Sequence, residues 1–151
     1  MLGDVRRVPA VKRLIALRGV ANVGKSTTIQ KVHQLLLAKY PTGECKYGAK
    51  PGKDVKVVIK IKGVRIGIES QGDPPGGRLE ESLKWFWRKR CKVIVCATRT
   101  RGKTVEVVER LADGYELLWL DQVKVSIRQQ ESSNLRMASQ IVRKVDQAIG
   151  E

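Results

Sequence analysis

Nine consecutive residues combine the types that bind phosphate: Gly19-Val20-Ala21-Asn22-Val23-Gly24-Lys25-Ser26-Thr27. Gly19 and Gly24 carry no Cβ, so the backbone between them can turn tightly and bring successive N–H groups close to an anionic oxygen. Lys25 adds a positive charge directly after the second glycine. Ser26 and Thr27 add hydroxyl groups that can bind a metal ion or a phosphate oxygen. The spacing therefore predicts a phosphate-binding loop.

This loop lies between a strand pattern and a helix pattern. Arg13–Arg18 is a short, mostly apolar run that predicts a buried strand. Lys25–Tyr40 predicts a helix, because its apolar residues recur at the spacing of one helix face. A helix that begins at the loop adds N–H groups and the positive end of its dipole to an anion site. A glycine-rich turn that binds nothing is the alternative interpretation.

The loop matches the pattern G-x-x-x-x-G-K-[ST], the Walker A motif, and the chain here resembles the P-loop NTPase superfamily. The resemblance is tight over Leu14–Leu36 and looser elsewhere. It implies a three-layer α/β fold, a nucleoside triphosphate bound with Mg²⁺, and phosphoryl transfer or hydrolysis. Lys25 would then bridge the β- and γ-phosphates, Ser26 would bind Mg²⁺ and Thr27 would bond a phosphate. The expected nucleotide-binding residues are Gly19, Asn22, Val23, Gly24, Lys25, Ser26 and Thr27.

Two alternating segments follow the first helix. Val55–Ile61 and Val64–Ile68 alternate apolar and other residues, and Lys62-Gly63 separates them, which predicts a β-hairpin. We expect Val55–Ile61 to lie at the edge of the sheet, where its lysines would guard it. Pro41–Lys53, with its prolines and glycines, predicts a loop.

An acidic residue ends this hairpin. Glu69 follows a hydrophobic run, as a Walker B acid does, and would bind Mg²⁺ or orient the attacking group. Asp73 competes for that role, although it also suits a simple turn before Pro74.

The hairpin before this acid resembles the GTPase-like branch of P-loop proteins. That branch carries D-x-x-G, and the matching stretch here, Glu69-Ser70-Gln71-Gly72, begins with Glu. The guanine-reading pattern N-K-x-D is absent from the sequence. We therefore expect ATP rather than GTP as the nucleotide, with Mg²⁺.

A second loop, Thr98–Thr104, follows the apolar strand pattern Val93–Ala97 and is expected at the carboxyl edge of the sheet. Arg99 and Arg101 could clamp phosphates there, because a guanidinium presents a planar fork to phosphate oxygens. A basic surface loop without a ligand is the alternative.

The chain is strongly basic, with 30 Lys and Arg against 15 Asp and Glu. Such a balance favours polyanions, although it also suits a charged surface. The predicted helix Arg78–Arg90 is basic towards its end and holds Trp85 outside its apolar stripe, a combination that can bind nucleic acid. A solvated face is the alternative. This helix end and the Thr98–Thr104 loop follow adjacent elements, so they could form one basic surface.

The remaining patterns complete one domain over residues 1–151. Thr104–Ala112 predicts a helix, Tyr115–Leu120 a strand, and a last helix capped by Ser132-Ser133-Asn134 follows. Together the elements predict a three-layer α/β fold with about five mostly parallel strands and one antiparallel edge strand.

The cysteines and the hydropathy of the sequence are used to predict where in the cell the protein is located. Cys45, Cys91 and Cys96 form no C-x-x-C pair, which favours reduced thiols and a cytoplasmic protein. No stretch approaches the length that spans a membrane, and no signal peptide is expected.

Three functions agree with these patterns. The first is a Mg²⁺-dependent NTPase that uses ATP and acts as a switch or motor. The second is a small-molecule or nucleotide kinase that transfers the γ-phosphate of ATP. The third is an ATPase that works with nucleic acid, which the charge favours.

Overall fold

Strands and helices alternate along the part of the chain that the computed structural model describes, residues 12–20, 23–41, 43–48, 55–70 and 77–150. The elements are β1 (Arg13–Arg18), α1 (Lys25–Lys39), β2 (Glu44–Gly48), β3 (Lys56–Ile61), β4 (Val64–Glu69), α2 (Gly77–Arg88), β5 (Val93–Thr98), α3 (Lys103–Leu111), β6 (Glu116–Asp121) and α4 (Ile127–Ala148).

All the strands belong to one six-stranded sheet of order β2-β3-β4-β5-β1-β6. β1 pairs in parallel with β5 and β6, and β4 pairs in parallel with β5. β3 is antiparallel to both of its neighbours. The prediction of a mostly parallel α/β sheet with an antiparallel strand is therefore confirmed, with one strand more than expected.

That additional strand corrects two expectations. β2 lies within Pro41–Lys53, which was expected to be a loop, and it pairs with β3. Val55–Ile61 is therefore not at the sheet edge, because β2 covers it. The sequence of β2, Glu-Cys-Lys-Tyr-Gly, lacks apolar alternation, so its strand depends on the hydrogen bonds that β3 offers rather than on its own pattern.

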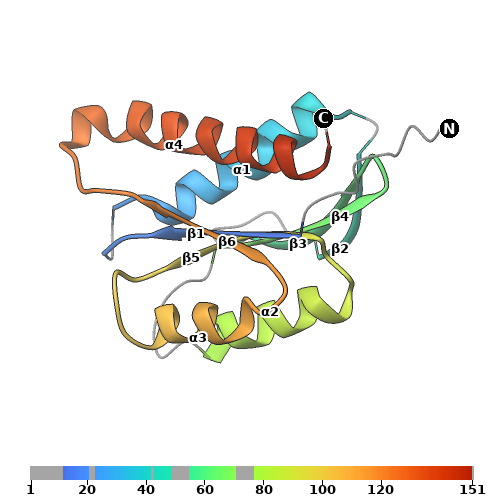
Figure 1. Cartoon of the computed structure of the whole chain (residues 1–151). Helices are drawn as coiled ribbons and strands as arrows, with labels where there is room; N and C mark the ends of the chain where they lie inside the picture. The colour runs from blue at the N-terminus through green and yellow to red at the C-terminus, as the bar shows by residue number, and fades with distance from the viewer. Residues whose placement is uncertain (1–11, 21–22, 42, 49–54, 71–76, 151) are drawn as a thin grey trace, which may run out of the picture.

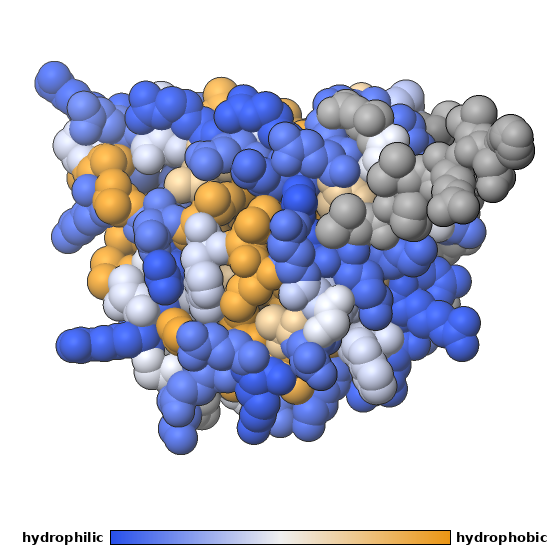
Figure 2. All heavy atoms as spheres, in the orientation of Figure 1, coloured by the Kyte–Doolittle hydropathy of each residue, from blue (hydrophilic) through white to orange (hydrophobic). Residues whose placement is uncertain are grey.

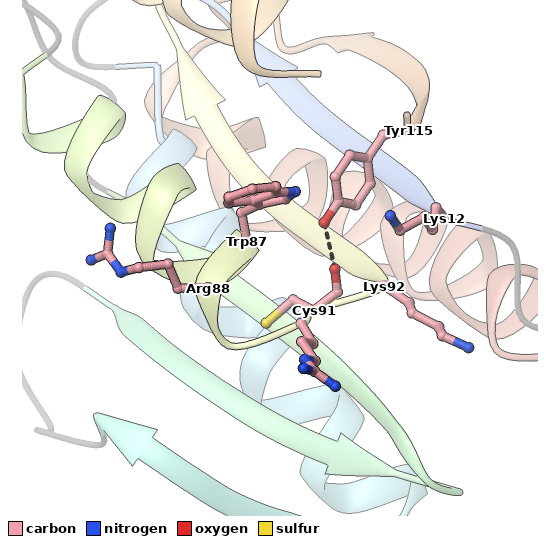
Figure 3. A pocket seen from close by; sticks show the side chains of 7 residues that line it. Lys12, Trp87, Arg88, Cys91, Lys92 and Tyr115 are labelled. Carbon is pink, nitrogen blue, oxygen red and sulfur yellow. Dashed lines mark hydrogen bonds between the residues drawn. The ribbon is translucent and has the colours of Figure 1, made fainter. Parts of the chain in front are cut away.

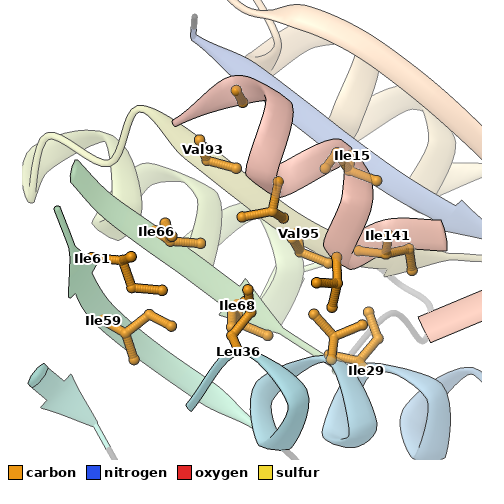
Figure 4. Close-up of a cluster of buried hydrophobic side chains, with 14 of the residues drawn as sticks. Ile15, Ile29, Leu36, Ile59, Ile61, Ile66, Ile68, Val93, Val95 and Ile141 are labelled. Atoms are coloured by element: carbon orange, nitrogen blue, oxygen red, sulfur yellow. The ribbon is translucent and has the colours of Figure 1, made fainter. Parts of the chain in front are cut away.

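Helices cover both faces of the sheet, so the fold has the predicted three layers. Figure 1 shows α1 and α4 on one face and α2 and α3 on the other. The side chains of β1 alternate between these faces: Ile15 and Leu17 join the core beneath α1 and α4, whereas Leu14 and Ala16 join the core beneath α2 and α3. Figure 4 shows the first of these cores, where Ile29 and Leu36 of α1 and Ile141 of α4 meet side chains from the sheet.

Local backbone geometry confirms the predicted hairpin between β3 and β4. Lys62 and Gly63 form its two-residue connection, and both have positive φ angles, 51° and 80°. A tight turn of this kind has a backbone twist that matches the twist of the flanking strands.

The last helix begins earlier than expected. α4 starts at Ile127 with Ser126 as its N-cap residue, so Ser132, Ser133 and Asn134 lie inside the helix rather than cap it. The expected cap was wrong because such polar residues favour helix starts in general, without specifying which one begins the helix. Asn134 is instead buried, with 4% of its surface exposed.

The face shown in Figure 2 is mostly hydrophilic, with hydrophobic side chains gathered in its middle. β6 runs across this face as the last strand of the sheet, and Leu117–Leu120 are only partly buried there. Within the described ranges, no helix combines the length and the apolar character needed to cross a membrane.

Candidate nucleotide-binding site

The carboxyl ends of three parallel strands lie in register at one edge of the sheet. Arg18, the last residue of β1, is opposite Thr98 of β5 and Asp121 of β6. The segments that follow these strands therefore leave from the same edge. The predicted phosphate loop and the arginine-bearing loop after Thr98 are thus neighbours, as expected for the ligand edge of an α/β sheet.

Lys25 is buried at this edge, with 8% of its surface exposed, as the first residue of α1. Its Nζ donates hydrogen bonds to the carbonyl oxygens of Gly19, at 2.5 Å, and Thr98, at 2.8 Å. The side chain thus folds back over the loop towards the ends of β1 and β5. This arrangement holds a positive charge beside the loop and the start of α1.

The two glycines of the loop are required by geometry. Gly24 has a φ of 95°, in the left-handed region, and a Cβ there would lie 2.6 Å from Asn134 Oδ1. A Cβ at Gly19 would lie 2.7 Å from the carbonyl oxygen of Gln122. Any side chain at either position would therefore displace its neighbours.

The start of α1 has the features of an anion site. Its N-cap residue is Gly24, which has no side chain to cap the helix, and its first turn holds no acidic residue. Ser26 is partly buried and Thr27 is exposed in that turn. The positive end of the helix dipole and these two hydroxyl groups therefore belong to the same turn of α1 as Lys25.

A buried amide network holds the loop, and sequence reasoning missed it. Gln122 Nε2 donates to Val23 O at 2.9 Å and to Asn134 Oδ1 at 2.6 Å, and Gln122 Oε1 accepts from the Thr28 hydroxyl at 2.9 Å. Gln122 follows β6, so these bonds join the loop and α1 to β6 and α4. The only signal in the sequence is a polar residue directly after a strand, which does not reveal its partners.

The Asp121 carboxylate of β6 forms a hydrogen bond with the neighbouring strand, β1. Its Oδ1 accepts a hydrogen bond from Arg18 Nε at 2.7 Å, and the guanidinium also lies 4.7 Å from the centroid of the Trp119 ring. The hydrogen bond from Arg18 lowers the pKa of the Asp121 carboxyl below its usual value. This hydrogen bond joins the carboxyl ends of β1 and β6.

Glu69 is the last residue of β4, and β4 does not pair directly with β1. β5 separates β4 from β1, which places Glu69 about 10 Å across the sheet from β1. Ile68 is opposite Val95, so Glu69 lies level with Cys96 and short of the edge at Thr98.

The Glu69 side chain is completely buried and accepts a hydrogen bond from the Ser82 hydroxyl of α2. Burial, and then the charge of Glu69, raise the pKa of the Cys96 thiol. The competing acid, Asp73, and the loop residue Asn22 lie outside the described residues.

The arginine-bearing loop is held by its own backbone contacts. The Arg99 N–H donates to Thr104 Oγ1 at 2.9 Å, and the Thr98 hydroxyl donates to Arg99 O at 2.8 Å. Arg99 is partly buried and Arg101 is exposed. The structure therefore brings Arg99 and Arg101 to the same edge as Lys25.

The two basic groups that could form one surface lie at opposite edges of the sheet. The basic end of α2 precedes β5 and Arg99 follows it, so the length of β5, about 20 Å, separates them. Trp85 is not a free stacking platform either. Its ring lies 5.5 Å from that of Phe86, and the Lys56 ammonium lies 5.1 Å from its centroid.

Metal-ligating residue types and the single histidine were also located in the part of the chain that the structure describes. No group of three or more His, Cys, Asp or Glu side chains there is arranged to hold a metal ion. His33 of α1 is partly buried, and burial lowers its pKa. Comparisons with protein-family models, curated proteins and solved structures found no significant match to this chain.

Proposed function

We propose that the chain binds ATP with Mg²⁺ in the Gly19–Thr27 loop and hydrolyses its terminal phosphoanhydride bond. The observation that supports this most directly is the buried Lys25 ammonium, held by the carbonyl oxygens of Gly19 and Thr98 beside the start of α1. A positive charge buried at the end of a strand–glycine loop–helix unit suits a phosphate group.

Each residue near the loop has a role in this proposal. Lys25 binds the β- and γ-phosphates, Thr27 bonds a phosphate oxygen, and the Ser26 hydroxyl is a ligand of Mg²⁺, which neutralises phosphate charge when bound. Arg99 and Arg101 stabilise the charge that develops on the terminal phosphoryl group. Glu69 or Asp73 orients the attacking water.

ATP is preferred to GTP in this proposal, because no N-K-x-D pattern is present to read guanine. Competition between the unlabelled nucleotides for a fluorescent ATP analogue tests the preference. GTP binding about tenfold tighter than ATP binding, or ~1.4 kcal/mol, would contradict it.

A kinase is the second candidate, and a groove beside the site favours it. The groove has a volume of about 820 Å³ and lies between α2 and α3. Its lining includes Gly77 and Lys103, the first residues of these helices, so it begins at the carboxyl edge of the sheet. A phosphate acceptor bound there would lie near Arg99 and Arg101.

Lys25→Ala separates the proposal from a loop that binds nothing. We expect the variant to bind Mg²⁺-ATP much more weakly in calorimetric titration and to lose turnover. Lys31→Ala, on the same helix, is the matched control and should keep both. Thermal unfolding of each variant is measured alongside, because Lys25 also binds two backbone carbonyls. Unchanged affinity and turnover in a folded Lys25→Ala protein would refute the site.

The product identifies the reaction. ATP labelled at the γ-phosphate is incubated with the protein alone and with nucleosides, nucleotides or small phosphate acceptors. Release of free phosphate supports hydrolysis, whereas transfer of the label to an acceptor supports the kinase.

We place this activity in the cytoplasm. Cys91 and Cys96 are free thiols, and both are buried. Free thiols are typical of a reducing compartment.

A further inference from the structure

A pocket of about 480 Å³ lies at the edge of the sheet opposite the phosphate loop. Its lining comes from the segments that lead into β1, β5 and β6, that is, from the amino ends of these parallel strands. Figure 3 shows aromatic and basic side chains around it. The lining residues are Lys12, Trp87, Arg88, Arg90, Cys91, Lys92 and Tyr115.

The charged side chains among the described residues of this pocket are all positive. Four of its lining residues, Lys12, Arg88, Arg90 and Lys92, are exposed cations, and none of the described residues that line it carries a carboxylate. Among the described residues, none of the four forms an ion pair. By contrast, Lys84 and Arg110 on the neighbouring surface both pair with Glu80. Clustered cations without carboxylate partners attract polyanions and raise their local concentration.

An exposed tryptophan stands beside these cations. Trp87 has 65% of its surface exposed, although large aromatic residues are usually well buried. It also lines a second pocket of about 380 Å³, together with Arg88, Leu83 and Leu111. The indole ring therefore lies between two adjoining hollows, where a planar group can reach it.

A second ring in the first pocket is held in place. The Tyr115 hydroxyl donates a hydrogen bond to Cys91 O at 2.6 Å, drawn as the dashed line in Figure 3. The Lys12 ammonium lies 5.3 Å from the centroid of the same ring. The pocket thus combines a fixed aromatic wall, an exposed aromatic ring and clustered positive charge.

We propose that this surface, formed by Lys12, Trp87, Arg88, Arg90, Lys92 and Tyr115, binds single-stranded nucleic acid. A base stacks on Trp87 and the phosphates pair with the four cations, because stacking on an aromatic ring next to a basic groove is how unpaired strands are held. A duplex keeps its bases stacked inside and would leave the indole unused. A volume of about 480 Å³ is within the range of small-ligand pockets, so it can admit a nucleotide unit.

This surface is independent of the proposed ATP site. Lys92 and Thr98 lie at opposite ends of β5, and the strand spans about 20 Å. Lys25→Ala should therefore leave oligonucleotide binding intact, and loss of oligonucleotide binding should leave the phosphate loop able to bind ATP. The two proposals can thus fail separately.

Fluorescence anisotropy with labelled oligothymidylate of about 12 nucleotides tests the proposal. Two further probes are an abasic oligomer of the same length and a duplex of the same length. We expect oligothymidylate to bind more tightly than either. Trp87→Ala should weaken this binding on the order of tenfold, whereas Trp87→Phe, which keeps an aromatic ring, should keep most of it.

The charge variants complete the test. Arg88→Gln with Arg90→Gln should weaken binding and reduce the slope of log K against log salt by roughly 1.4, about 0.7 for each phosphate that is no longer neutralised. Lys31→Gln with Arg143→Gln removes the same charge from α1 and α4, on the other face of the sheet, and should leave the slope nearly unchanged. Equal binding of the abasic oligomer, tighter binding of the duplex, or full affinity in Trp87→Ala would each overturn the proposal.

Discussion

The Phe86 ring of α2 lies directly against the backbone of Gly67 in β4. A Cβ at Gly67 would be 2.5 Å from Phe86 Cγ and 2.6 Å from Cδ1, which is closer than side chains approach one another. Phe86 is completely buried there, in the core beneath α2 and α3. The glycine thus makes room for the largest fully buried side chain of this core.

Gly67→Ala should therefore destabilise the protein by about 1–3 kcal/mol, because the added methyl group overpacks the core. Chemical denaturation measures the change. Gly77→Ala is the control, since a Cβ at Gly77 would meet nothing within 4 Å. Combining Gly67→Ala with Phe86→Leu should cost less than the sum of the single changes. If the effects of the two changes on the free energy of unfolding were strictly additive, the Phe86 ring would not be what restricts the side chain at position 67.

Gln122→Met should lower both stability and nucleotide affinity. Methionine is close to glutamine in size but leaves the Thr28 hydroxyl, Val23 O and Asn134 Oδ1 without their buried hydrogen bonds. We expect a loss of at least about 2 kcal/mol in the free energy of unfolding, measured by denaturation. Gln129→Met, at an exposed position of α4, should change little. Equal stability of the two variants would mean that the network does not hold the loop.

Glu69→Gln should reduce ATP turnover on the order of 10²-fold while ATP still binds. Glutamine keeps the size of the side chain, and its carbonyl oxygen can still accept from Ser82, so the fold should persist. Phosphate release is the measurement, with Ser82→Ala as a control for the loss of that hydrogen bond alone. If Asp73→Asn gives the turnover defect and Glu69→Gln does not, Asp73 has the catalytic role.

The buried thiols should make the protein less stable in alkali. Burial raises the pKa of Cys91 from 9.0 to about 12, and it also raises the pKa of Cys96. Below pH 9 both thiols are protonated in the folded and the unfolded chain. Above pH 9 only the unfolded chain releases these protons, so the free energy of unfolding should fall as pH rises.

Urea denaturation between pH 8 and pH 10 measures this slope, and Cys91→Ala with Cys96→Ala should flatten it. Tyr115, whose pKa rises from 10.0 to about 12 through burial, adds to the slope only as the pH approaches 10. A variant with the slope of the parent protein would contradict the assignment.

Local patterns predicted the strand–loop–helix unit around Lys25, the hairpin at Lys62-Gly63 and the layered sheet. These features depend on periodicity and turn residues within short stretches. The sequence pattern did not predict β2, because that strand depends on pairing with β3 rather than on alternating apolar residues.

The surroundings of the site depend on strand order, which no short pattern specifies. Gln122 reaches Val23 only because β6 lies beside β1 and α4 packs near the loop. Trp87, rather than the expected Trp85, is the exposed ring, because Trp85 packs against Phe86 and Lys56. The assignment of chemistry to Lys25, Glu69, Arg99 and Arg101 stays a prediction that the variants above test.

The contact between Gly24 and Asn134 links the proposed ATP site to the motions of the last helix. If α4 opens locally, Asn134 leaves Gly24 and Gln122 loses one of its partners, so the loop loses part of the network that holds it. A ligand that requires the closed loop must then oppose the opening of α4, since it binds only the closed form. Amide hydrogen exchange in α4 should therefore slow when Mg²⁺-ATP is added, although the proposed phosphate site is at the start of α1.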